Sequence, residues 1–135
     1  MVSREDLESY LLRMDVEYEE VDEAMWLLKP MGSGTDVVVS YAPPVVLLRL
    51  KVMHLPDDTD DTRLASFYRR LLELNATDIL HGSYGIEAND VVLSDALELQ
   101  DLDFSELRSS FESMVLAATS HTPKLSELVP VALQG

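Results

Sequence analysis

Residues 71–87 constrain the fold more than any other part of this chain. The apolar residues before and within this stretch recur with the 3.6-residue period of a helix, namely Leu64, Phe67, Tyr68, Leu71 and Leu72. Asn75 follows, and asparagine tolerates the left-handed conformation at a helix C-terminus, so the helix is predicted to end there. Residues 82–87 then alternate, with Tyr84 and Ile86 on one side. These patterns predict a helix that covers a sheet and then a strand of that sheet.

The first half of the chain predicts one helix and four strands. Ser3 is the expected N-cap, Asp6 occupies the capping-box position, and the helix is expected to end near Asp15. Strands are expected at residues 16–21, 25–29, 37–41 and 45–53. The turn cluster 30–34 and the Pro43-Pro44 pair separate the later strands. Links this short exclude parallel crossovers, so the strands should form an antiparallel meander.

The second half adds a β-hairpin and a final helix. Residues 88–90 are the expected turn between strands 82–87 and 91–97. Asp103 should cap the third helix, with Glu106 at the capping-box position. Thr122 and Pro123 are expected to open a separate short helical turn after it. The order of helix, antiparallel strands, helix, β-hairpin and helix predicts an α+β fold with helices packed on a sheet. Residues 1–130 should form one domain, and residues 131–135 a loose tail.

This order of elements, together with three short segments, resembles the YbjN-like family, whose fold is similar to that of type III secretion chaperones. The segments are Tyr68-Arg69-Arg70-Leu71-Leu72-Glu73-Leu74-Asn75, Gly82-Ser83-Tyr84-Gly85-Ile86 and Leu99-Gln100-Asp101-Leu102-Asp103. The resemblance implies a chaperone-like, homodimeric module that binds other polypeptides, as an adaptor or a bacterial regulator. It supplies no catalytic residue. Because folds do not fix functions, the implied activity is an analogy.

The charge of the chain favours some partners over others. Its net charge is −15, from 10 lysines and arginines against 25 acids, and residues 81–103 contain six acids and neither lysine nor arginine. Such a field repels phosphate backbones, which disfavours direct nucleic-acid binding. A basic protein, or one that itself binds nucleic acid, is the expected partner, although the charge also has a plain explanation in solubility.

Composition also bears on location. The chain has no cysteine, so disulfides and cysteine zinc sites are excluded. Its N-terminus has no apolar signal core. The longest apolar run, residues 45–48, has the length of a strand rather than of a membrane span. The sequence predicts a cytoplasmic protein that does not associate with membranes.

Few residues suggest chemistry. The run Asp57, Asp58, Thr59, Asp60 and Asp61 could bind a divalent cation, and a small metal-dependent enzyme is the alternative reading of the sequence. Its position just before a helix favours capping of the free N–H groups instead. His54, His81 and His121 lack zinc-site spacing. No phosphate-loop or nucleophile-elbow motif is present, so no catalytic residue, cofactor or metal is predicted.

Partly exposed aromatic and apolar side chains are the best candidates for contacts with a partner, since such groups often anchor interfaces. Six residues on the predicted strands and the second helix fit this description: Tyr18, Trp26, Tyr41, Phe67, Tyr68 and Leu71. The alternative for the strand aromatics is ordinary core packing.

Overall fold

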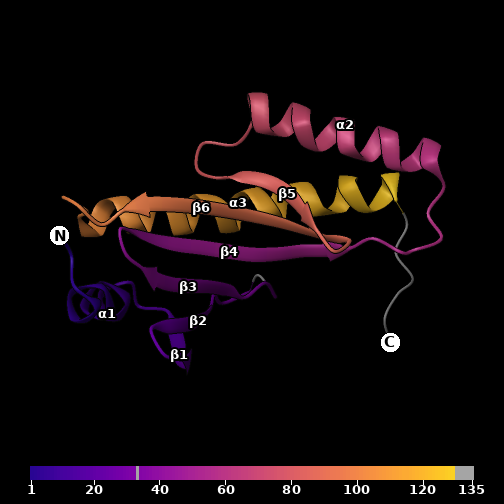
Figure 1. The fold of residues 1–135 in the computed structure, drawn as a ribbon. Helices are drawn as coiled ribbons and strands as arrows, with labels where there is room; N and C mark the ends of the chain where they lie inside the picture. Colours follow the sequence, from indigo (N-terminus) through magenta and orange to yellow (C-terminus); the bar gives the residue numbers. More distant parts are fainter. Residues whose placement is uncertain (33, 130–135) are drawn as a thin grey trace.

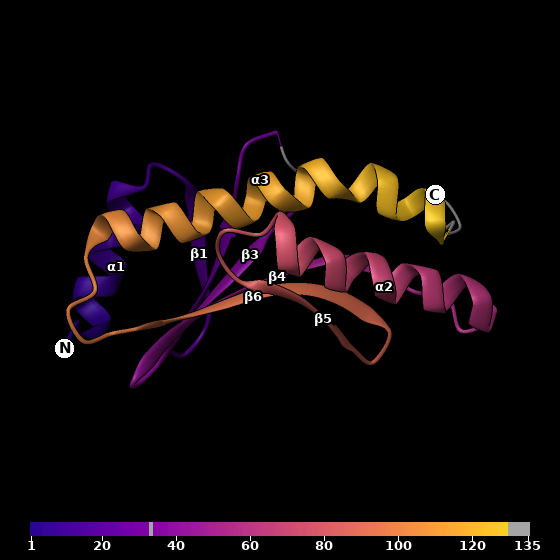
Figure 2. The same cartoon turned by 90° about the horizontal axis from the view of Figure 1, so that it is seen from above.

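The computed structural model describes residues 1–32 and 34–129, in an α+β arrangement of three helices and one antiparallel sheet (Figures 1 and 2). The helices are α1 (Arg4–Arg13), α2 (Asp61–Thr77) and α3 (Phe104–Leu128). The strands are β1 (Glu17–Asp22), β2 (Met25–Lys29), β3 (Val37–Ala42), β4 (Val45–His54), β5 (Ser83–Glu87) and β6 (Asp90–Glu98). Their order in the sheet is β1-β2-β3-β4-β6-β5. The predicted order of elements is confirmed, whereas the expected tail at 131–135 lies outside the described residues.

Local signals position most of these elements as predicted. Ser3 and Asp6 form the expected capping box: the Ser3 hydroxyl accepts from the Asp6 N–H, and the Asp6 carboxylate accepts from the Ser3 N–H, each at 3.1 Å. These hydrogen bonds hold the pKa of Asp6 below its ordinary value. Asp103 caps α3 by accepting from the Glu106 N–H. Ala88 and Asn89 both have positive φ, the conformation that a two-residue hairpin turn between β5 and β6 requires.

The helix α2, predicted to end at about Asn75, ends at Thr77, and the Asn75 side chain bonds a neighbouring strand. One prediction about a helix end is wrong. Thr122 and Pro123 do not open a separate turn, because α3 runs through both. The Thr122 hydroxyl donates to the carbonyl oxygen of Ala118 at 2.6 Å. An unbroken helix also keeps Leu125 on the buried side, which stabilises the helix despite the missing proline N–H.

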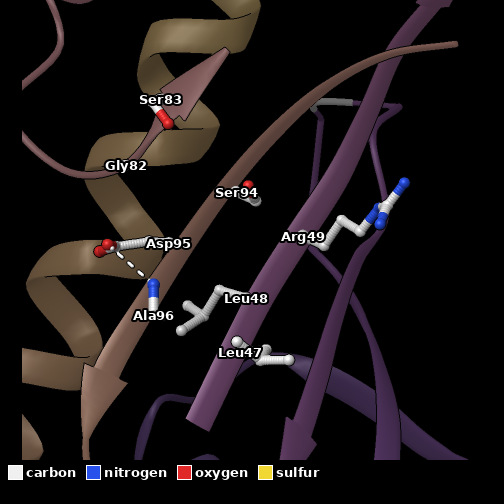
Figure 3. A pocket seen from close by; sticks show the side chains of 8 residues that line it. All are labelled: Leu47, Leu48, Arg49, Gly82, Ser83, Ser94, Asp95 and Ala96. Atoms are coloured by element: carbon white, nitrogen blue, oxygen red, sulfur yellow. Dashed lines mark hydrogen bonds between the residues drawn. The ribbon is translucent and has the colours of Figure 1, made fainter. Parts of the chain in front are cut away.

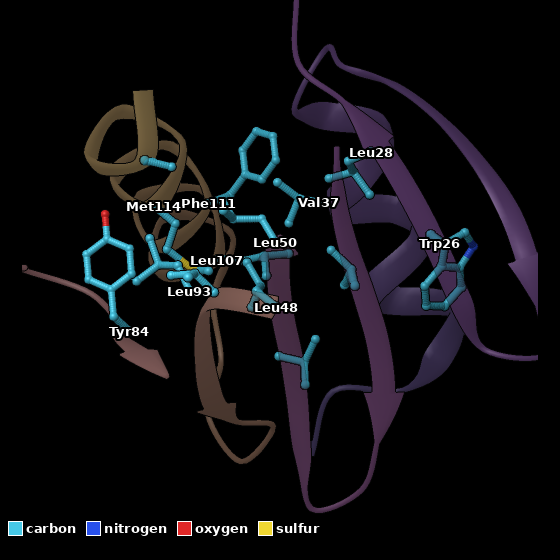
Figure 4. Packing of buried hydrophobic residues seen from close by; sticks show 14 of the residues in the cluster. Trp26, Leu28, Val37, Leu48, Leu50, Tyr84, Leu93, Leu107, Phe111 and Met114 are labelled. Carbon is cyan, nitrogen blue, oxygen red and sulfur yellow. The ribbon is translucent and has the colours of Figure 1, made fainter. Parts of the chain in front are cut away.

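One hydrophobic cluster joins the sheet to all three helices. Figure 4 shows the part of it between the sheet and α3. Alternate residues of β4, including Val46, Leu48 and Leu50, are buried, while the residues between them are partly or fully exposed. The exposed side chains on the opposite face form ion pairs between strands, such as Arg49 with Glu87 at 2.7 Å. One face of the sheet therefore holds the core, and the other is a polar surface.

Candidate protein-binding surface

The six interface candidates divide into buried and exposed residues. Trp26 and Phe67 are fully buried and Leu71 is 4% exposed, so these three side chains lie in the core and a partner cannot contact them on the folded chain. For Trp26 this is the ordinary core packing given above as the alternative, and Phe67 and Leu71 belong to the face of α2 that covers the sheet. Tyr18 and Tyr41 are partly buried, and the Tyr41 hydroxyl donates to the carbonyl oxygen of Val2 at 3.0 Å. Only Tyr68 remains well exposed, at 37%.

Tyr68 belongs to an exposed apolar stripe on α2. This α2 outer stripe consists of Ala65, Tyr68, Leu72 and Ala76, which recur at helical spacing and are all exposed. Leu72 is 67% exposed, a high value for leucine in the middle of a helix. Because α2 packs beside β5 at the end of the sheet, the stripe faces away from the core (Figures 1 and 2). This stripe is a candidate contact surface for another polypeptide.

The Asn75 side chain closes one position on the outer edge of β5. Its Oδ1 accepts from the N–H of Tyr84 at 2.7 Å, and its Nδ2 donates to the carbonyl oxygen of Tyr84 at 3.3 Å. The amide therefore takes the place of one residue of a neighbouring strand, and it ties α2 to the sheet. From the sequence pattern, Asn75 was expected at the C-terminus of the helix. In the structure its side chain instead bonds the backbone of Tyr84.

A chain of hydrogen bonds joins β5, α3 and the C-terminus of α2. The Tyr84 hydroxyl lies 2.7 Å from His121 Nδ1, and His121 Nε2 lies 2.6 Å from the Asp78 carboxylate. Burial, and secondarily the charge of Asp78, raises the pKa of Tyr84, so the phenol keeps its proton and can donate to Nδ1. His121 therefore links the Tyr84 hydroxyl to the Asp78 carboxylate through its two ring nitrogens. A phenol held in its protonated form is a structural donor rather than a nucleophile.

A hollow lies where β5 begins beside β6 (Figure 3). It has a volume of about 580 Å³ and is lined by Leu47, Leu48, Arg49, Gly82, Ser83, Ser94, Asp95 and Ala96. Asp95 faces the core side of the sheet, where Oδ2 accepts from the fully buried Ser110 hydroxyl at 2.7 Å. The sequence analysis missed Asp95. Its signal was a carboxylate at an apolar position of the alternation Val91, Leu93, Asp95, Leu97.

The acidic run before α2 has structural roles. Asp60 is the N-cap of α2 and accepts from the Arg63 N–H at 2.9 Å, which confirms the capping interpretation for this residue. Asp57 accepts from Asn89 Nδ2 at 2.9 Å. Nowhere in residues 1–32 and 34–129 do three histidine, aspartate or glutamate side chains gather as metal ligands. No helix in the same part of the chain is long and apolar enough to cross a membrane.

The family model CesT_Tir_1 matches residues 2–130. The chain belongs to the CesT_Tir_1 family. A search of curated proteins finds no match to this member of the family. The match spans every element of the fold, from α1 to the end of α3, and the resemblance to secretion chaperones is confirmed.

Several solved structures share the fold of this chain at low sequence identity. YbjN from E. coli, described as a candidate transcription regulator, is similar with a TM-score of 0.69, 13% identity and coverage of 90% of this chain and 92% of that one. A chain of the heterodimeric ExoU–SpcU complex from the type III secretion system of Pseudomonas aeruginosa has a TM-score of 0.64, 14% identity and coverage of 90% and 96%. A chain of the HopA1–SchA chaperone–effector complex has a TM-score of 0.61, 10% identity and coverage of 87% and 90%.

Proposed function

We propose that this protein is a non-catalytic binding module that holds a partner polypeptide, as a chaperone-like adaptor or regulator in the cytoplasm. The observation that carries the proposal is the family match over residues 2–130. Two of the similar structures are complexes of proteins with other proteins, one of them a chaperone with its effector. The exposed α2 outer stripe gives this chain an apolar surface suited to such contacts.

The partner proposed is basic, or is itself a nucleic-acid-binding protein, because the chain carries a net charge of −15. Tagged protein used as bait in its native lysate should capture one stoichiometric partner, which elutes as salt rises from roughly 0.1 to 1 M because salt screens exposed charges. Mass spectrometry would identify it, and the tag alone is the control. An empty eluate would contradict the binding role, and release that is indifferent to salt would contradict the electrostatic part.

The proposal includes a homodimer formed through the α2 outer stripe. The wild-type protein should show about twice the monomer mass of 15.1 kDa in analytical ultracentrifugation at micromolar concentration. Leu72→Glu should shift the protein to the monomer mass, because it places a charge in an apolar contact.

A matched control comes from α1. Leu12 is 68% exposed, nearly the same as Leu72 at 67%, but it lies on α1 rather than on α2. Leu12→Glu should therefore leave the dimer intact while making the same change in charge. A wild-type protein that is monomeric, or a Leu72→Glu variant that remains dimeric, would show that the α2 outer stripe does not form the contact.

A further inference from the structure

The strand β6 is longer than the strand that covers its outer side. β5 pairs with β6 only from Ser83 opposite Ser94 to Glu87 opposite Asp90. On the other side, β4 accompanies β6 along its full length, from His54 opposite Asp90 to Val45 opposite Glu98. Residues 95–98 therefore have a neighbouring strand on one side only. We call this segment the β6 free edge; both views show it extending beyond β5 (Figures 1 and 2).

The backbone groups of the free edge point toward the open side. The N–H and carbonyl of Tyr84 are bonded by the Asn75 side chain, so they face away from β6. The pair Tyr84–Leu93 is then a non-hydrogen-bonded pair, and the next pair, Ser83–Ser94, exchanges the ladder hydrogen bonds. Because these directions repeat every two residues, the backbone groups of Ala96 and Glu98 face the same side as those of Ser94. No strand of the described chain lies there to meet them.

One of these groups is held by a side chain that can give way. The N–H of Ala96 donates to Oδ1 of Asp95 at 3.0 Å, the dashed line in Figure 3. An incoming strand would offer a backbone carbonyl to this N–H and release Oδ1. The other oxygen of Asp95 stays bonded to Ser110. The released oxygen would then be ready to pair with a cation on the new strand.

Gly82 keeps the space beside the free edge open. Its φ is +84°, and a Cβ at this position would lie 2.5 Å from the carbonyl oxygen of Ser94. Only glycine fits this close approach, and the chain joins the sheet just after it, so that β5 begins at Ser83 and does not run alongside residues 95–98. The hollow of about 580 Å³ described above lies at this point. The hollow beside the β6 free edge therefore results from the backbone conformation of Gly82 and its close approach to Ser94.

We propose that the β6 free edge is a strand-addition site for an extended segment of a partner protein that carries lysine or arginine residues. This inference rests on the proposed binding function and names where and how a partner binds. The charge around the edge selects the occupant: Asp95 and Glu98 lie on it, and residues 81–103 contain neither lysine nor arginine. Arg49, the cation in the hollow, is paired with Glu87 at 2.7 Å. A second copy of this chain, with its charge of −15, is the less complementary occupant.

Ala96→Pro tests the site because proline has no N–H to donate. The change removes no bond to β4, and an edge position accepts proline. Ala96→Ser, which keeps the N–H, is the matched control. The probe is a fluorescein-labelled nine-residue peptide of alternating valine and lysine, with a valine–glutamate peptide as its counterpart, measured by fluorescence anisotropy. Wild type and Ala96→Ser should bind the lysine peptide, Ala96→Pro should bind it roughly tenfold more weakly, and the glutamate peptide should not bind.

Amide hydrogen exchange on the wild-type protein gives a test that needs no variant to fold. Saturation with the lysine peptide should slow exchange at Ala96 and Glu98, whereas the amides of β2 should not change. Equal affinity of the proline and serine variants, absence of binding by the wild type, or protection confined to other strands would each overturn the proposal. Loss of dimer mass in Ala96→Pro would also overturn it, because the edge would then be a contact between copies.

The same variant separates this inference from the proposed function. If wild-type bait captures a partner and Ala96→Pro bait captures it equally well, the binding function stands and the strand-addition site is wrong. If the wild-type bait captures nothing, the proposed function itself fails.

Discussion

Replacing Trp26 with alanine is expected to lower the free energy of unfolding by about 3–5 kcal/mol, the usual cost of emptying a large buried site. The Trp26 side chain is fully buried on β2, on the side of the sheet that holds the core (Figure 4). The guanidinium of Arg4, on α1, lies 5.7 Å from the centre of its ring. Urea denaturation followed by circular dichroism would measure the change. The effect is a large fraction of the stability of a typical domain.

Tyr68→Ala is the comparison for Trp26→Ala, because both remove an aromatic ring that the sequence analysis offered as an interface residue. Tyr68 is 37% exposed on α2, so its removal should cost the isolated chain less than about 1 kcal/mol. A Trp26→Ala protein as stable as the wild type would contradict this prediction, because removal of a ring that fills the core must leave a cavity.

The case of Trp26 shows where prediction from sequence stops. The strand β2 was predicted with its observed bounds because its residues are apolar and turn residues flank it. However, both of its faces are apolar, with Trp26 and Leu28 on one and Met25 and Leu27 on the other. Alternation therefore does not indicate which face meets the helices, and that depends on pairing with residues distant in sequence. The apolar stripe predicted for α2 shows the same limit, because Phe67 and Leu71 are buried whereas Tyr68 and Leu72, on the edge of the stripe, are exposed.

Helix ends show the opposite limit, in which local signals are present but packing overrules them. Thr122-Pro123 is a good helix start, yet α3 continues through it, with Leu125 buried on its inner side and Val129, the residue that caps it, buried just beyond its end. The two contacts with the core depend on the helix remaining in register over its whole length. Of the candidate binding surface, the sequence therefore indicated Tyr68, but it did not indicate the β6 free edge, because that edge depends on where β5 begins opposite β6.

Asn75→Ala is expected to lower the free energy of unfolding by about 2–3 kcal/mol. The change leaves both the N–H and the carbonyl of Tyr84 without their side-chain partner in a partly buried place, and each unpaired group costs about 1–3 kcal/mol. Urea denaturation would measure the loss, and hydrogen exchange should show faster exchange at the Tyr84 amide. Asn75→Asp is the control. It keeps an acceptor for the Tyr84 N–H but loses the donor to the carbonyl, so it should fall between the wild type and Asn75→Ala.

The loss in Asn75→Ala should also expose the edge of β5 to other strands, because an unpaired N–H and carbonyl form a template for pairing. Light scattering should therefore show more self-association in Asn75→Ala than in the wild type at equal concentration. If stability and the exchange rate of the Tyr84 amide were both unchanged, the amide of Asn75 would not close this edge. The Tyr84 N–H and carbonyl would then not point away from β6. The outward direction of the Ala96 N–H, which follows from that of Tyr84, would lose this support.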